Sequence, residues 1–246
     1  MTAEPGRIND RWELMLLPHR VEFHAKRPRW EAPRLASCAE RTEPGMSVWD
    51  IGAEEGDFTS LYRSWVGEAG RLVAIEPQPA YWPAIRQTWE ANALGDPPGV
   101  FCGFASDITE AHPPRDALEA GRVLSRDGWP ACSIGSVQPD FGFRHLAQQT
   151  DSTPQVTLDD LAELHGQPDV IVMDIEGAEV QALRGASELL ASAPLLVYVS
   201  AHPVPMREWY GVEMRDLHEL MLGHGYAGTY LGAEIEEFWL FEKASA

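Results

Sequence analysis

Acidic residues and glycines at positions 50 to 76 are the part of this chain whose types and spacing most clearly indicate chemistry. Asp50 ends a short apolar run, Gly52 and Gly56 follow it, and Glu76 ends the next apolar run. Glycines let a ligand approach the backbone closely, and a carboxylate after the second strand of such a unit can hold ribose hydroxyls. These residues predict a site for a cofactor that contains a nucleoside.

The charge of this glycine loop selects among nucleoside cofactors. A dinucleotide needs the spacing GxGxxG, so that backbone amides and a helix N-terminus can face its diphosphate, and the loop lacks that spacing. Its carboxylates are Asp50, Glu54, Glu55 and Asp57. They would repel a diphosphate but suit the sulfonium and the ammonium of S-adenosylmethionine. The alternative is a tight turn whose acidic residues only stabilise the start of a solvated helix.

A second group of chemically capable side chains follows two later apolar runs. Asp174 comes directly after residues 170–173, and His202 comes after residues 195–199. If these runs are neighbouring parallel strands, both side chains lie at one edge of a sheet. There Asp174 can orient an acceptor or ligate a metal, and His202, with an ordinary pKa of about 6.5, can be a general base toward a hydroxyl. We include Glu176 in this group of candidate catalytic residues. The alternative is that Glu176 only stabilises a helix start and that His202 is a structural histidine.

Alternating strands and helices must position these residues. Apolar runs predict parallel strands at residues 48–51, 72–75, 100–104, 170–173 and 195–199. Periodic patterns predict helices at residues 10–17, 81–93, 156–164 and 214–222. A further helix is expected to open with Glu176 and Glu179 on one face, and residues 225–231 and 235–241 predict a closing antiparallel hairpin. This pattern indicates an α/β fold with a doubly wound, mostly parallel sheet.

Three other regions carry weaker signals. Ser106 and Asp107 follow the third strand, where polar groups can reach an adenine or where Asp107 merely caps a turn. Prolines allow only short helices in the N-terminal arm, residues 1–46. A basic patch in this arm comprises Arg20, Lys26, Arg27 and Arg29 beside His19, His24 and Trp30. The patch can hold an anionic acceptor, but a solvated arm or a subunit contact is the simpler interpretation. An irregular insert at about residues 111–155 is expected to shape the acceptor site.

Length and composition favour one main domain, which we place at residues 47–246. The chain has 246 residues with 44% hydrophobic content, enough for one substantial core. A net charge of -19 argues against duplex nucleic acid or an anionic membrane as the main partner. Three scattered cysteines indicate a reducing compartment, and no apolar run reaches the length of a membrane span, so we expect a cytoplasmic protein. The oligomeric state stays open.

The chain resembles the FkbM type of S-adenosylmethionine-dependent methyltransferase, a class I family with a seven-stranded Rossmann-like sheet. The matching segments are DIGAEEGDFT at 50–59, IEPQP at 75–79, ASD at 105–107, VTLDDL at 156–161 and, most specifically, MDIEGAEVQALRGASELL at 173–190. The resemblance implies methyl transfer to an oxygen of a sugar or natural product, so that the partner is a small-molecule or glycan acceptor. It also implies that the cofactor lies against Asp50, Gly52, Ala53, Gly56, Glu76, Pro77, Ser106 and Asp107.

Two residues depart from the family pattern. Glu54 stands where the family usually has Asn, and Ser200 stands where it usually has Glu. The missing acid at position 200 weakens the case for a divalent metal, which wants several oxygen ligands. Two other functions stay open: an S-adenosylmethionine-binding protein without transferase activity in a biosynthetic assembly and, against the glycine spacing, a nicotinamide-dependent oxidoreductase.

Overall fold

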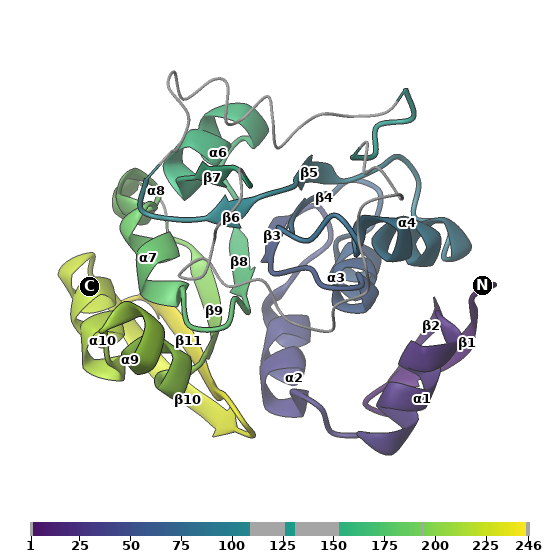
Figure 1. The fold of residues 1–246 in the computed structure, drawn as a ribbon, viewed down its shortest axis with the longest axis horizontal. Helices are drawn as coiled ribbons and strands as arrows, with labels where there is room; N and C mark the ends of the chain where they lie inside the picture. The colour runs from purple at the N-terminus through teal and green to yellow at the C-terminus, as the bar shows by residue number, and fades with distance from the viewer. Residues whose placement is uncertain (1, 109–125, 131–152, 193, 245–246) are drawn as a thin grey trace.

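A seven-stranded sheet with strand order β10-β11-β9-β8-β3-β4-β5 is the centre of the fold (Figure 1). The computed structural model describes residues 2–108, 126–130, 153–192 and 194–244. The strands of this sheet are β3 (Ser47–Ile51), β4 (Arg71–Ile75), β5 (Gly99–Phe101), β8 (Val170–Met173), β9 (Leu196–Ala201), β10 (Tyr226–Ala233) and β11 (Glu237–Lys243). The first five are parallel to one another, and the hairpin of β10 and β11 joins β9 antiparallel. The predicted doubly wound sheet with a C-terminal hairpin is confirmed.

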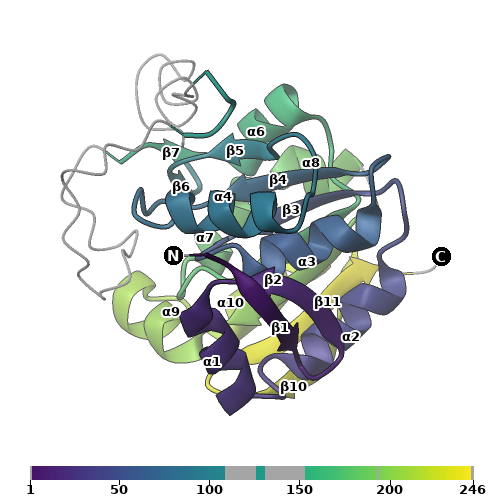
Figure 2. The same ribbon diagram turned by 90° about the vertical axis from the view of Figure 1, so that its right-hand side faces the viewer.

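Helices cover both faces of this sheet, as Figures 1 and 2 show. One face carries α2 (Ala32–Arg41), α3 (Asp57–Val66) and α4 (Trp82–Ala91), and the other carries α6 (Leu158–His165), α7 (Glu179–Arg184), α8 (Ser187–Ser192) and α10 (Met214–Gly223). The side chains of β3 point alternately to the two faces of the sheet, and each face packs against one of these helix layers. Val48 packs in the core with α3 and α4, whereas Trp49 and Ile51 pack in the core with α6 and α7. Both faces of the strand are therefore buried, as a central parallel strand requires.

The N-terminal arm begins with a hairpin in place of a predicted helix. Strands β1 (Glu4–Ile8) and β2 (Trp12–Leu16) pair antiparallel, so the helix expected at residues 10–17 is wrong. Asn9 and Asp10 both have positive φ, 51° and 54°, and with Arg11 they form the hairpin turn between the paired residues Ile8 and Trp12. In β2 the buried residues Leu14 and Leu16 alternate with more exposed ones, a period of two rather than 3.6. Two short helices follow, α1 (Pro18–Lys26) and α2, as the prolines predict.

Two predicted elements differ at the edge of the sheet where the site lies. The third strand ends at Phe101, and β6 (Phe104–Ala105) instead pairs with β7 (Gln155–Val156) in a separate small sheet. The helix expected to open with Glu176 begins at Glu179, because Glu176 and Gly177 turn through φ values of 56° and 101°. The two glutamates therefore do not share a helix face.

Most of the insert predicted at residues 111–155 lies outside the described residues. Its Trp129 is described and buried, with its ring 6.2 Å from that of Trp89 in an edge-on contact. This tryptophan is part of the core packing. The domain boundary at residues 46 and 47 stays a prediction. Across the described residues, we find no helix with both the length and the apolar character that a membrane crossing needs.

Candidate active site

A pocket of about 280 Å³ lies where β3, β4 and β8 end. This is the edge of a parallel sheet at which ligands bind in open α/β folds. Of the predicted cofactor residues, Asp50, Gly52, Ala53, Glu76 and Pro77 line the pocket. Gly56, Ser106 and Asp107 are not among its lining residues in the described part of the chain, although the neighbouring Gly103, Phe104 and Ala105 are.

Glu76 is held with its carboxylate in the wall of the pocket. One oxygen accepts the backbone N–H of Gln78 at 2.7 Å, and the other accepts that of Glu54 at 3.0 Å. The residue is only 4% exposed, and this burial raises the pKa of the Glu76 carboxyl to about 8. Asp50 is also buried, accepts a hydrogen bond from the Thr59 hydroxyl, and has its pKa raised by burial to about 7. Two carboxyls that lack full solvation thus face the pocket and favour a cationic, hydroxyl-bearing ligand.

Gly52 permits the close approach of β3 and the segment after β8. Its φ is 93°, and a Cβ there would lie 1.9 Å from the backbone oxygen of Asp174. Gly56 has a φ of 80°, and a Cβ would lie 2.8 Å from the Cα of Ile85 in α4. Gly56 therefore packs α3 against α4, whereas Gly52 brings the two halves of the pocket together.

Gly52→Ala is expected to lower the free energy of unfolding by about 3 kcal/mol or more, because it combines positive-φ strain with a backbone clash. Gly211→Ala is the matched control, since Gly211 has a φ of 65° in the left-handed region but no atom within 4 Å of its Cβ position. The control isolates the φ strain alone, which costs on the order of 1 kcal/mol. Urea unfolding of the two variants measures the difference, and equal losses would show that the contact with Asp174 is unimportant.

The N-terminal arm binds the acidic glycine loop through ion pairs. Arg20 lies 2.7 Å from Asp57 and 3.2 Å from Glu54, and the buried His24 lies 2.6 Å from Asp57. His19 pairs with Glu55. Although burial alone would raise the pKa of Asp57, Arg20 and His24 together hold it well below its usual range. Much of the loop charge is thus offset by the arm, and these basic residues are not free for an anionic acceptor.

Asp57→Asn is expected to lower the free energy of unfolding at pH 7 by about 3 kcal/mol, because Arg20 loses its buried partner. The pKa of Asp57 is depressed in the native state, so its contribution to stability is present above the ordinary pKa of 3.8 and is lost as the pH falls. The gap between variant and wild type should therefore narrow below about pH 4. Glu22→Gln, which breaks an exposed pair with Lys26 in α1, should change stability little. Similar losses in both variants in denaturant titrations would contradict this account.

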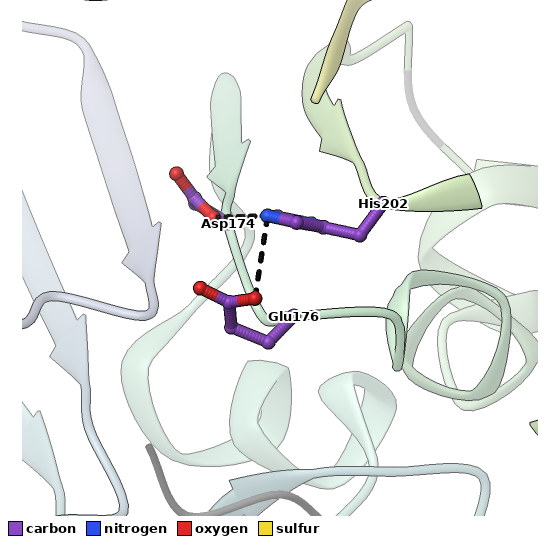
Figure 3. A group of neighbouring side chains, drawn as sticks. All are labelled: Asp174, Glu176 and His202. Carbon is purple, nitrogen blue, oxygen red and sulfur yellow. Dashed lines mark ion pairs between the residues drawn. The ribbon is translucent and has the colours of Figure 1, made fainter. Parts of the chain in front are cut away.

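The predicted catalytic residues meet at the ends of β8 and β9, as Figure 3 shows. His202 Nε2 lies 3.5 Å from Asp174 Oδ1 and 3.6 Å from Glu176 Oε2. Both carboxylates line the pocket, and their side chains are 30% and 31% exposed. The placement of Asp174 and His202 at adjacent strand ends is as expected from the sequence.

The expectation that His202 is neutral is wrong for this arrangement. Burial lowers its pKa, but the hydrogen bond with Glu179 and the charges of Asp174 and Glu176 outweigh burial and raise it to about 10. The carboxylates around His202 therefore favour its imidazolium form. In that state it can hold its carboxylate neighbours in place but cannot accept a proton from a hydroxyl.

Three residues of this site were not selected from the sequence. Glu179 is fully buried and lies 2.9 Å from His202 Nδ1. Glu31 and Arg34 form a buried ion pair in the arm and line the pocket. A glutamate three residues before an arginine is common on exposed helices, so no sequence signal distinguishes this pair. A backbone signal does exist in the structure, since Glu31, Glu54 and Glu176 all have positive φ and all line the pocket.

Comparisons with known proteins place this site in a family. The Methyltransferase FkbM domain model matches residues 50–227. A putative rRNA-methylase from Clostridium thermocellum is 12% identical, with 87% of this chain and 94% of that chain covered and a TM-score of 0.50. Fibrillarin from Aeropyrum pernix, with natively bound S-adenosyl-L-methionine, is 12% identical over 86% of this chain and 73% of that one, with a TM-score of 0.48.

A precorrin-6y C5,15-methyltransferase from Geobacter metallireducens GS-15 is 15% identical, with 87% and 88% of the chains covered and a TM-score of 0.47. None of the curated proteins matches the chain significantly. At 12% identity the rRNA-methylase structure shows a shared fold alone, whereas the family model spans most of the chain, from β3 to the start of β10. This family membership rules out the two alternative functions considered from the sequence, a nicotinamide-dependent oxidoreductase and a binding protein without transferase activity. The chain belongs to the FkbM family of methyltransferases and is an enzyme that uses S-adenosylmethionine.

Proposed function

We propose that this enzyme methylates a hydroxyl oxygen of a small-molecule or glycan acceptor, such as a sugar or a natural product. The observation that carries the proposal is the group formed by Asp174, Glu176 and His202, because its two carboxylates line the same pocket as Glu76. Polar groups beside a methyl donor can orient a hydroxyl and accept its proton. The net charge of -19 supports a small acceptor over a polyanion.

The residues of the pocket fit the donor at several points. Asp50, Gly52, Ala53, Glu76 and Pro77 would hold it, with the Glu76 carboxylate toward the ribose hydroxyls. Ser106 and Asp107 would lie toward the adenine, beside the lining residues Phe104 and Ala105. The carboxylates of the wall would offset the positive charge of the donor.

The acceptor would lie between the donor and the N-terminal arm. Phe23 and Trp30 of the arm line the pocket together with Phe58 and Tyr81. Aromatic faces of this kind pack against sugar rings and flat natural products and exclude water from the reacting atoms. The arm is fixed over the site by the pairing of Arg20 with Asp57.

The reaction needs positioning more than covalent chemistry by the protein. S-adenosylmethionine, when bound, supplies a methyl group whose bond to sulfur breaks with the electron pair kept by sulfur, while the acceptor oxygen forms the new bond to carbon. Asp174 would orient the hydroxyl and take its proton, since its carboxylate lines the pocket. His202 would act as a positioning residue that fixes Asp174 and Glu176. Holding two reactants in line can supply roughly 7 kcal/mol or more of barrier lowering.

The test is a methyl-transfer assay with labelled S-adenosylmethionine and a panel of sugars, glycosides and hydroxylated natural products, analysed by mass spectrometry. We expect a mass gain of one methyl group on a hydroxyl of at least one acceptor class, with S-adenosylhomocysteine formed in equal amount. Matched acceptors in which that hydroxyl is replaced by hydrogen should not react. Methylation of nitrogen or carbon only, or of RNA in place of these acceptors, would contradict the proposal.

A further inference from the structure

The spacing of Asp174, Glu176 and His202 differs from that of a directly hydrogen-bonded group. Nε2 of His202 lies 3.5 and 3.6 Å from the nearest oxygens of the two carboxylates (Figure 3). Direct N–H···O bonds are usually 2.7 to 3.2 Å long. Two ligands of one ion at about 2.1 Å lie roughly 3.0 to 3.4 Å apart. One nitrogen and two carboxylate oxygens lie within 4.8 Å of one another, so small side-chain movements would bring all three to the bonding distance of one ion in the space between them.

Glu179 fixes His202 so that Nε2 faces this space. The Glu179 carboxylate lies 2.9 Å from Nδ1, is fully buried, and also accepts the backbone N–H of Gly177 at 3.0 Å. A carboxylate on one imidazole nitrogen orients the ring and increases the basicity of the other nitrogen, which is how histidine ligands of metals are commonly held. His202 is itself only 7% exposed. Its orientation is therefore fixed by a buried residue that lies outside the pocket.

The loop that carries Glu176 is also held rigidly. Glu176 has a φ of 56°, which costs energy for a residue with a Cβ. The following Gly177 packs so closely on α9 (Pro203–Tyr210) that a Cβ would lie 2.6 Å from Pro205. The strained turn directs Glu176 back toward His202, which follows β9 and precedes α9. Strain of this kind persists where the surrounding structure enforces it and is typical of ligand sites.

Negative charge is in excess around this space. Among the described residues, five carboxylates lie close by, those of Glu31, Asp174, Glu176, Glu179 and Glu236, and the cations that face them are His202 and Arg34. A divalent cation would offset this charge directly. Glu31, Asp174 and Glu236 also approach one another, but they offer acids alone and Glu31 is already paired with Arg34.

We propose that Asp174, Glu176 and His202 bind one divalent metal ion in the wall of the donor pocket. A mixed set of one imidazole nitrogen and two carboxylate oxygens suits first-row ions such as Mn²⁺. Three protein ligands leave coordination positions open, and these would face the pocket that Asp174 and Glu176 line. Binding would replace the proton on Nε2, which passes to solvent.

The role of this ion rests on the proposed function, since a hydroxyl acceptor is the group that would take an open position. An ion there would polarise the hydroxyl and lower its pKa beside the methyl donor. The sequence argument against a metal was the absence of an acid at position 200. Ser200 is buried within β9, and the three ligands come from positions 174, 176 and 202, so this site does not depend on residue 200.

The experiment measures Mn²⁺ binding to the full chain in the absence of donor and acceptor. Electron paramagnetic resonance follows the loss of the free Mn²⁺ signal, and calorimetry gives the stoichiometry. We expect one ion per chain. Affinity should fall at least about 10-fold in Glu176→Gln and His202→Gln, and a similar loss is expected in Glu179→Gln, which acts only through His202.

Glu236→Gln is the matched control, because Glu236 lies near Asp174 but is not a proposed ligand. It should lose much less Mn²⁺ affinity than Glu176→Gln, because it removes a nearby charge but no ligand atom. Glu176 is partly exposed on a loop, so its variant tests the site without disturbing the core. No binding by the wild type, unchanged binding in Glu176→Gln, or equal losses in Glu236→Gln would overturn the proposal.

A methylation assay after chelation separates this proposal from the proposed function. Mn²⁺ binding with the expected variant pattern but no methylated hydroxyl would support the metal site and reject the acceptor class. Full hydroxyl methylation in a protein that binds no Mn²⁺ would reject the metal site and leave the acceptor class standing.

Discussion

Replacement of His202 by glutamine is expected to lower kcat by at least about 100-fold, the loss typical when one preorganised polar group is removed from an active site. The affinity for S-adenosylmethionine should stay within about 2-fold of wild type, because His202 is not among the residues that line the pocket in the described part of the chain. Glutamine keeps a similar size but carries no positive charge. It therefore cannot hold the carboxylates of Asp174 and Glu176 as His202 does.

Steady-state kinetics and calorimetry with the donor measure the two effects separately. His224→Gln is the control, since His224 caps the end of α10 and is not among the described residues that line the pocket. It should match the wild type in both measurements. A merely structural role for His202 would lower the thermal midpoint and donor affinity together with kcat, and an unchanged kcat in a folded variant would remove this residue from the site.

Glu76→Gln is expected to weaken S-adenosylmethionine binding by about 10- to 100-fold above pH 8, where the Glu76 carboxyl is ionised, since hydrogen bonds to a charged group are each worth about 1.5 to 3 kcal/mol. The carboxylate already accepts two backbone N–H groups, from Glu54 and Gln78, and its remaining lone pairs would accept from the ribose. A glutamine amide must turn its NH2 toward one of these donors. The variant therefore loses a backbone hydrogen bond as well as the charge that faces the donor.

Calorimetric titration with S-adenosylmethionine measures the change in Kd. Glu90→Gln is a suitable control because Glu90 pairs with Arg86 on the exposed face of α4, outside the pocket. The control should bind the donor like the wild type. Equal affinities in Glu76→Gln and the wild type would show that the donor does not lie against β4.

The site residues that directly follow a strand could be predicted from the local sequence. Gly52, Asp50 and Glu76 lie at the ends of apolar runs, and such runs place their ends at one edge of a parallel sheet. Asp174 and His202 could be paired for the same reason, because β8 and β9 are neighbours. Strand ends thus converge by topology alone.

The rest depends on contacts between distant segments. The hairpin of β1 and β2 could not be predicted from hydrophobic spacing, because the short apolar pattern in residues 10–17 fits a helix and a strand alike. The adjacent turn residues Asn9 and Asp10 favour the hairpin over the helix. The pairing of Arg20 with Asp57 joins segments far apart in the chain. The charge of His202 likewise depends on Glu179 and Asp174, and a reference pKa cannot include them.

The central claim is that one pocket holds the donor on Glu76 and presents its methyl group to an acceptor at Asp174, which His202 positions. A crystal structure of the enzyme with S-adenosylhomocysteine tests it most directly. We predict that the ribose hydroxyls lie within hydrogen-bond distance of the Glu76 carboxylate and that the sulfur faces Asp174. A product bound elsewhere, or bound in this pocket with its sulfur turned away from Asp174, would contradict the account.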